Sequence, residues 1–92
     1  MDLSQKVIFA ETVFAQEVDG EMVLLDMESE NYFGLDEVGT VMWQAMQEKE
    51  TLKDVLEALL EQYEVEAEML ENDLSNFVGK LVESGLVKVE ER

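Results

Sequence analysis

The sequence predicts an α+β fold in which a three-stranded antiparallel sheet is followed by three helices. Between residues 12 and 35 the apolar residues follow the patterns of strands, and after residue 36 they recur at helical spacing. The chain has 92 residues, of which 47% are hydrophobic, so residues 1–92 can form one domain with its own core. Residues 1–10 show no clear period, which leaves either a loose arm or an additional strand.

The three predicted strands form a meander. Residues 12–18 alternate and end at an Asp-Gly dipeptide, which is typical of a two-residue hairpin because the primed turns need positive φ. Residues 21–27 contain a run of consecutive apolar side chains, which favours a central strand. The polar residues 28–31 suit a second turn, and residues 32–35 form the third strand, which is therefore an edge of the sheet.

Capping signals delimit the three predicted helices. Asp36 is a good N-cap for the first helix, and Thr51, with Asp54 three residues on, caps the second. The third helix is longer and ends at Gly85, which matches a left-handed helix terminator covered by Leu86. Residues 86–89 suit a short final strand, and residues 90–92 are expected to fray. The predicted apolar stripes comprise Val38, Val41, Met42, Ala45 and Met46 in the first helix and Leu70, Leu74, Phe77, Val78, Leu81 and Val82 in the third.

Two short helices, a longer third helix and a small sheet are the pattern of a winged helix-turn-helix, a fold often used to bind DNA. The formal net charge of −17 argues against that use here, because nucleic-acid binding normally rests on a basic surface. The third helix carries several acids and Lys80 as its single base. A nucleic-acid-binding or regulatory protein is therefore only the alternative prediction. The negative charge either favours a neutral or basic partner or serves solubility alone.

The composition also disfavours an enzyme. The chain has no histidine and no cysteine, its five glycines are isolated, and no serine has a base to activate it, so no catalytic residue and no cofactor site is predicted. Glu28, Glu30 and Asp36 leave weak cation binding open, but their spacing matches no calcium loop and no metal site is predicted. No apolar run could span a membrane and no signal peptide is evident, so we expect a cytoplasmic protein.

The predicted third strand is the best candidate for a binding site. An exposed strand edge is an aggregation hazard unless it is short, charged or meant to be paired. Gly34 removes a side chain where a second backbone could approach, so a peptide could add to this edge with the third helix as the far wall. The alternation does not decide whether Tyr32 or Phe33 faces such a groove. The same edge could instead join two copies of the chain as a dimer.

At this point the sequence resembles the PqqD family of small chaperones that hold the leader of a ribosomally made precursor peptide. The resemblance runs from about Phe14 to Val89. Its departure from the quinone-pathway members is the stretch Asp26-Met-Glu-Ser-Glu30, where those members usually carry Tyr-Pro-Glu. The strand at 32–36 and the later Trp43 are more similar to stand-alone leader-binding proteins of lasso-peptide clusters. The segments that carry the resemblance are Gly20–Asp26, Asn31–Asp36, Val41–Trp43, Thr51–Tyr63 and Asp73–Val87.

The resemblance implies a winged helix-turn-helix whose third strand receives the leader as an antiparallel strand packed against the third helix. It implies a non-catalytic adaptor whose partners are the precursor peptide and a modifying enzyme or leader protease. The net charge and the lack of an apolar span lead us to expect no nucleic acid and no membrane as partner, and the exposed strand edge leaves a monomer or a weak homodimer. By position, the implied peptide-binding residues are Asn31, Tyr32, Phe33, Gly34 and Leu35 on the strand and Leu70, Asp73, Leu74, Phe77 and Leu81 on the helix.

Overall fold

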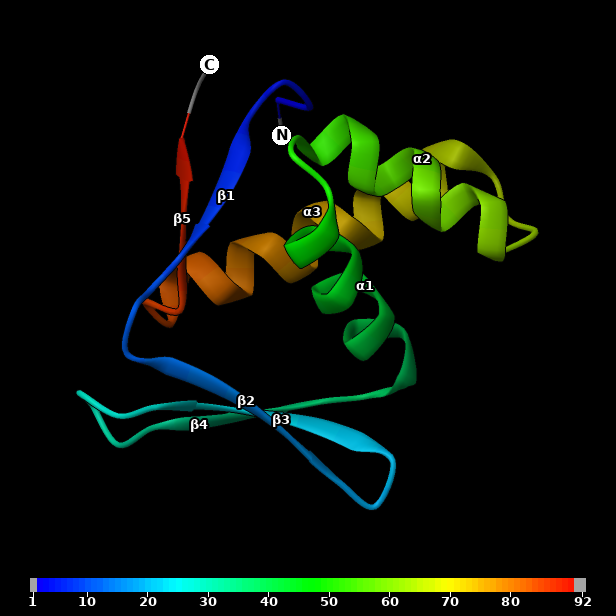
Figure 1. Ribbon diagram of the computed structural model, residues 1–92. Coiled ribbons are helices and arrows are strands. Elements are labelled where there is room, and N and C mark those ends of the chain that lie inside the picture. The colour runs from blue at the N-terminus through cyan, green and yellow to red at the C-terminus, as the bar shows by residue number, and fades with distance from the viewer. Residues whose placement is uncertain (1, 91–92) are drawn as a thin grey trace.

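The computed structural model describes residues 2–90 of the chain (Figure 1). It confirms the predicted α+β order of a three-stranded antiparallel sheet followed by two short helices and a longer one. Two further short strands lie near the ends of the chain. In order, the elements are β1 (Lys6–Phe9), β2 (Val13–Val18), β3 (Glu21–Asp26), β4 (Tyr32–Leu35), α1 (Glu37–Glu48), α2 (Leu52–Gln62), α3 (Ala67–Glu83) and β5 (Val87–Glu90).

The main sheet has the order β2-β3-β4, so β3 is central and β4 is an edge, as predicted. Asp19 and Gly20 have φ values of 52° and 84°, which is the conformation of the predicted primed hairpin turn. The register places Leu24 opposite Phe33 on one face and Leu25 opposite Tyr32 on the other. Leu24 is fully buried and Tyr32 is 79% exposed, so the face that carries Leu24 and Phe33 points to the core.

The N-terminal segment is an additional strand rather than a loose arm. β1 pairs antiparallel with β5 from Lys6 opposite Glu90 to Phe9 opposite Val87, which forms a separate two-stranded sheet. The ring of Phe9 packs edge-to-face on Trp43 of α1, with the two ring centroids 4.8 Å apart. This second sheet therefore ties both ends of the described chain to the helices. The expected fraying concerns Glu90, which belongs to β5, and residues 91–92, which lie outside the described residues.

The first two helices begin, and the third ends, at the residues that the capping signals predicted, whereas α1 extends to Glu48, into the residues expected to connect the first two helices. The Asp36 carboxylate accepts the N–H of Gly39 at 2.7 Å, and the Thr51 hydroxyl accepts the N–H of Asp54 at 3.2 Å. After α3 the chain forms a Schellman motif, in which Gly85 has a φ of 75° and the Leu86 N–H donates to the Leu81 carbonyl at 3.0 Å. This sharp end turns the chain directly into β5.

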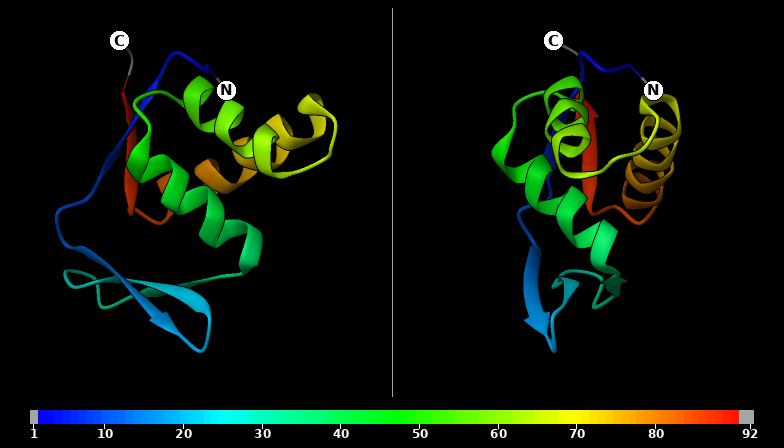
Figure 2. Two further views of the ribbon diagram at one scale, coloured as in Figure 1. Left: turned by 45° about the vertical axis from the view of Figure 1, so that its right-hand side comes forward. Right: turned by 90° about the vertical axis from the view of Figure 1, so that its right-hand side faces the viewer.

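The core lies among the three helices, and the inner face of the main sheet and the β1–β5 sheet close it (Figure 2). Leu24 of β3, Trp43 of α1, Leu59 of α2 and Leu74 of α3 are each at most 2% exposed. The prediction was wrong for Val38 and Val82, because each is 42% exposed at the margin of its helix's apolar stripe. No helix in the described part of the chain combines the length and the hydropathy needed to cross a membrane.

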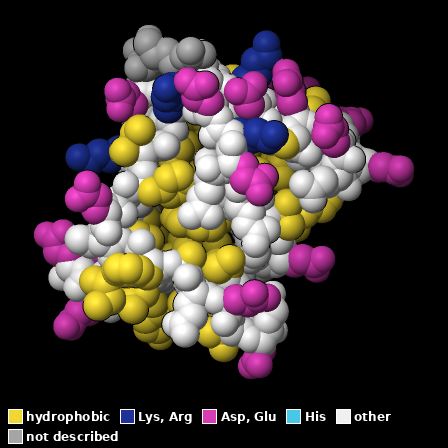
Figure 3. Space-filling view, in the orientation of Figure 1, with side chains coloured by type: hydrophobic (Ala, Val, Ile, Leu, Met, Phe, Trp, Pro, Cys, Tyr) yellow, Lys and Arg dark blue, Asp and Glu magenta, His cyan; other side chains and the backbone are white. Residues whose placement is uncertain are grey.

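The acidic side chains are dispersed rather than gathered into one patch. Figure 3 shows carboxylates around the whole margin of one face, with hydrophobic side chains in its middle and over the main sheet at the lower left. The ion pair between Lys6 and Glu50, 2.8 Å long, joins the start of β1 to the connection between α1 and α2. On this face the negative charge is therefore spread out rather than concentrated at one place.

Candidate functional site

The free edge of β4 presents main-chain hydrogen-bonding groups to solvent. The Asp26 N–H donates to the Asn31 carbonyl at 2.9 Å, and bonded pairs alternate along an antiparallel ladder. Phe33, opposite Leu24, therefore bonds to β3, whereas the N–H and C=O groups of Tyr32 and Gly34 point away from it. Among the described residues no strand pairs with β4 on that side. The edge can accept one more strand, which would pair with Tyr32 and Gly34.

A groove runs along this edge, between β4 and α3. The right-hand view of Figure 2 shows β4 and α3 on the same side of the molecule, with β2 on the opposite side. Three hollows of about 220, 250 and 420 Å³ succeed one another there. The first and second share Phe33, and the second and third share Phe77. The three hollows therefore adjoin one another along β4 and α3, and this row of hollows is the groove.

The groove wall on α3 is a stripe of its own, next to the buried stripe. Asp73, Phe77 and Lys80 line the groove along the helix, and Ser84 lines it just beyond the last turn. Their spacing of three and four residues places them on one face of a helix. Ser84 shares a hollow with Asn31 and Tyr32, whereas Asp73 shares a hollow with Asp36. β4 and α3 therefore run in opposite directions along the groove.

The ten predicted peptide-binding residues divide into two groups in the structure. Asn31, Tyr32, Phe33, Gly34, Asp73 and Phe77 line the groove. Leu35, Leu70, Leu74 and Leu81 are at most 4% exposed and belong to the core. Leu35 borders the middle hollow, but these four side chains have little surface to offer a ligand. Their part is to hold the two walls of the groove in place.

The lack of a side chain at Gly34 is not what opens the strand edge to a second backbone. Its neighbours Phe33 and Leu35 face inward, so a Cβ on Gly34 would project from the outer face of the sheet, where nothing lies within 4 Å. A side chain there would not obstruct a strand that approaches in the plane of the sheet. The contribution of Gly34 to the edge is therefore its N–H and C=O. Phe33, rather than Tyr32, presents its side chain to the α3 side of the groove.

Several groove residues were missed in the sequence. They comprise Asp36, Val38, Gly39, Met42, Asn76, Lys80, Ser84 and Leu86. Helical spacing from Phe77 would have found Lys80 and Ser84, because residues three and seven positions on share its face. Gly39 has no such signal. It is buried where α1 passes α3, and a Cβ on it would lie 3.4 Å from Cε1 of Phe77.

Asp26 anchors the turn that leads into β4. Its carboxylate accepts hydrogen bonds from the Thr12 hydroxyl at 2.8 Å, the Ser29 hydroxyl at 2.9 Å and the Glu28 N–H at 3.1 Å. These bonds, the one from Thr12 first, hold the pKa of Asp26 below its ordinary value of 3.8 because they stabilise the charged form. The side chain therefore fixes the entry of the edge strand against β2.

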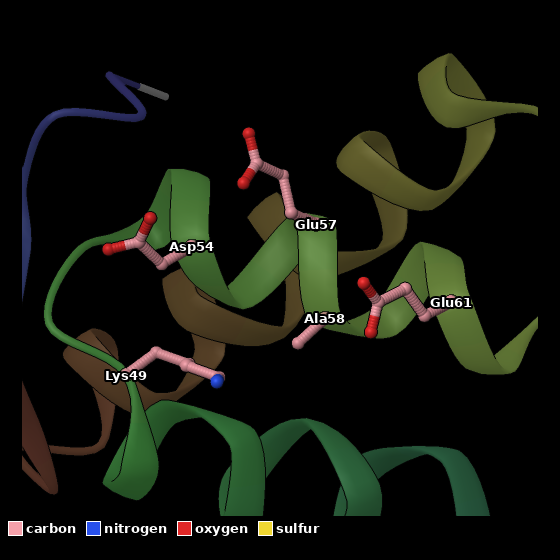
Figure 4. Close-up of a pocket in the computed structure, with 5 residues that line it drawn as sticks. All are labelled: Lys49, Asp54, Glu57, Ala58 and Glu61. Carbon is pink, nitrogen blue, oxygen red and sulfur yellow. The ribbon is translucent and has the colours of Figure 1, made fainter.

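Other hollows lack the features of a binding groove. One of about 330 Å³ is lined by Lys49, Asp54, Glu57, Ala58 and Glu61, and Figure 4 shows its charged side chains spread between α2 and the end of α1. It offers neither an open strand edge nor an aromatic wall. Among residues 2–90, no group of three or more acidic side chains is placed to hold a metal ion.

An open edge strand beside a helix-walled groove, on a winged helix-turn-helix scaffold, defines a class of small peptide-binding domains. Residues 21–87 match the family described as coenzyme PQQ synthesis protein D (PqqD), and the chain belongs to this family. This confirms the resemblance that the sequence suggested. No curated protein matched the chain at the significance required.

Two solved structures share the fold over almost the whole chain. One is TbiB1 in complex with the TbiA(beta) leader peptide, which is 30% identical, with a TM-score of 0.82 over 88% of this chain and 94% of that one. The other is lasso peptide synthetase B1 complexed with the leader peptide, which is 28% identical, with a TM-score of 0.82 over 90% of this chain and 98% of that one. The second likeness agrees with the expected similarity to lasso-peptide proteins, and both structures are complexes with a leader peptide.

Proposed function

We propose that this chain binds the leader of a ribosomally synthesised precursor peptide by strand addition to β4. The observation that carries the proposal is the open edge at Tyr32 and Gly34 beside a groove walled by α3. The two similar structures are both complexes with leader peptides, which supports the same use of this edge.

The leader lies antiparallel to β4, and its main chain bonds to Tyr32 and Gly34. Every second leader side chain then points toward α3, because side chains alternate along a strand. Phe33 and Phe77, both half-buried, supply apolar surface to these side chains from opposite walls. Main-chain bonds provide affinity that does not depend on the leader sequence, and the groove provides selection.

The chain is an adaptor without catalytic activity of its own, and it acts in the cytoplasm as one domain. The chemistry belongs to a separate modifying enzyme or leader protease, to which the bound precursor is presented. Holding the precursor close to that enzyme raises its effective concentration, which increases the rate of modification without new catalytic groups. The acids around the groove favour leaders with basic flanks and accelerate their encounter.

Amide chemical shifts test this proposal. The ¹⁵N-labelled chain is titrated with synthetic leader peptides of precursors, the TbiA(beta) leader among them, and with scrambled peptides of the same composition. We expect the largest shifts at the amides of Tyr32 and Gly34, whose N–H groups gain acceptors, and along α3 from Asp73 to Ser84. Shifts that cluster on α2 or on the β1–β5 sheet, or that the scrambled peptides reproduce, would contradict the proposed site.

The charges on α3 argue against the alternative of a nucleic-acid-binding protein. The exposed side of α3 carries Glu68, Asp73 and Glu83, which would face the phosphates of a duplex if this helix entered a groove. We therefore expect no gel-shift with duplex DNA at low salt, the condition that most favours such binding.

A further inference from the structure

Lys80 is the one basic residue among those that line the three hollows of the groove. It is the one basic residue of α3, and it borders the middle and the largest of the three hollows. Within residues 2–90, no ion pair involves its ammonium group, whereas Lys6 is paired with Glu50. In a chain of net charge −17, this is a place on the groove wall where a carboxylate of a ligand meets attraction.

Asp73 lies on the same wall with the opposite charge. It borders the largest hollow together with Asp36, at the end of the groove where β4 passes into α1. Lys80 reaches further along and shares the middle hollow with Phe33 and Gly34. The wall therefore presents an anion, the half-buried ring of Phe77 and then a cation, in that order along α3.

The separation of these charges translates into a spacing on the bound strand. Seven helical residues at about 1.5 Å each span about 10 Å, which corresponds to about three residues of a strand. Since only alternate side chains of the strand face α3, the matching positions are two or four residues apart. A peptide antiparallel to β4 runs parallel to α3, so it meets Asp73 before Lys80.

We propose that Asp73 and Lys80 read the charge register of the leader, a reading that rests on the proposed function. They select segments in which a basic side chain precedes an acidic one by two or four residues. The selection is largely by exclusion, because an acid displaced from Lys80 faces the surrounding carboxylates without a counter-charge. The main-chain hydrogen bonds to the edge are the same in every register of the leader. The two charges therefore determine which register is the most stable.

The experiment selects binders from a displayed library of random 14-residue peptides, using the intact chain as bait. We expect the enriched peptides to share a base followed by an acid at the stated spacing. With Lys80→Glu as bait the acidic position should change to Lys or Arg, and with Lys80→Gln its preference should disappear. With Asp73→Lys the first position should become acidic. The control is Lys53→Glu, which makes the same charge change on the exposed side of α2 and should leave the enriched pattern intact.

A synthetic enriched peptide then gives the magnitude. Lys80→Glu should weaken its binding about fivefold, as expected for a partly exposed ion pair, and an acid-to-Lys change in the peptide should restore the affinity. The variant Gly34→Pro, which lacks the N–H at this position, shows whether the selected peptides bind at the β4 edge. Peptides that lose affinity for this variant but show no charge register, or keep the same register with Lys80→Glu as bait, would overturn this inference and leave the proposed function standing. A library without binders, or with binders indifferent to the Gly34 N–H, would overturn both.

Discussion

Oδ1 of Asp36 accepts the backbone N–H of Gly39 at 2.7 Å, where the edge strand β4 passes into α1. A Cβ on Gly39 would lie 3.1 Å from this oxygen and 3.4 Å from Cε1 of Phe77 on α3. The helix cap and the close approach of α1 to α3 thus coincide. The end of the groove that holds Asp73 is built on this one turn of chain.

Removal of the cap should destabilise the fold measurably. We expect Asp36→Ala to lower the free energy of unfolding by about 1 kcal/mol, because an N–H at the start of α1 loses its acceptor. Asp36→Asn should cost less, since asparagine also caps helices well. Urea unfolding followed by circular dichroism measures both. If the two variants lost the same stability, the charge of Asp36 rather than its cap would be responsible.

The packing around Gly39 leaves little room for a side chain, whereas a Cβ on Gly79 would meet nothing within 4 Å. The effects of Gly→Ala on stability at the two positions should therefore differ. Both lie inside helices, where Gly→Ala usually adds about 1 kcal/mol of stability. Nothing lies within 4 Å of a Cβ on Gly79, so Gly79→Ala should gain this amount. Gly39→Ala should gain less or lose stability, because Asp36 and Phe77 must move to admit the methyl group. Equal increases in the free energy of unfolding, measured by urea unfolding, would show that Asp36 and Phe77 can move aside without cost.

The N–H of Gly34 can be removed without loss of a bond inside the sheet. It points to the open edge, so Gly34→Pro should leave the β3–β4 ladder intact and remove one donor to the leader. We expect leader affinity to fall at least tenfold by isothermal titration calorimetry. Gly34→Ala keeps the N–H and has space for its methyl group, so it should bind almost as the parent does. A normal affinity for the proline variant would place the leader elsewhere.

Local signals explain why much of this fold could be predicted from the sequence. The Asp-Gly turn, the caps at Asp36 and Thr51 and the terminator at Gly85 each act within a few residues, and the structure has all of them. The pairing of β1 with β5 joins opposite ends of the chain. Nothing local encodes such a contact, so the N-terminal segment could not be assigned from its residues alone.

The candidate site was harder to predict because two stripes lie side by side on α3. Leu70, Leu74 and Leu81 follow the helical period and are core, whereas Asp73 and Lys80 follow the same period rotated by one residue and line the groove. Apolar periodicity finds the first stripe and passes over the second. On β4, the buried position of Leu24 opposite Phe33 decides which side chain faces inward. That choice depends on sheet register and on packing from distant segments.

Acid should loosen the entry to β4 through Asp26. Hydrogen bonds hold its pKa below 3.8 in the folded chain, so the ionised form adds stability that is complete above the unfolded pKa. This contribution is lost as the pH falls from about 4 through the depressed pKa. We expect Asp26→Asn to be less stable than the parent at pH 7, with a difference that shrinks below about pH 4. Thermal unfolding across pH measures it, and a difference independent of pH would contradict the assignment.

The open edge of β4 also permits pairing between two copies of the chain, and charge should oppose it. An antiparallel pair of β4 strands places Glu30 of one copy near Asp36 of the other, so like charges meet at both ends. We expect a monomer at low salt and weak self-association as salt screens these charges. Sedimentation velocity over a range of concentration and salt measures this. Glu30→Lys should strengthen association and lower its salt dependence, whereas Glu57→Lys on α2 should not. Leader peptide, which occupies the same edge, should dissociate any dimer, and a dimer that persists with the leader bound would place the contact on another surface.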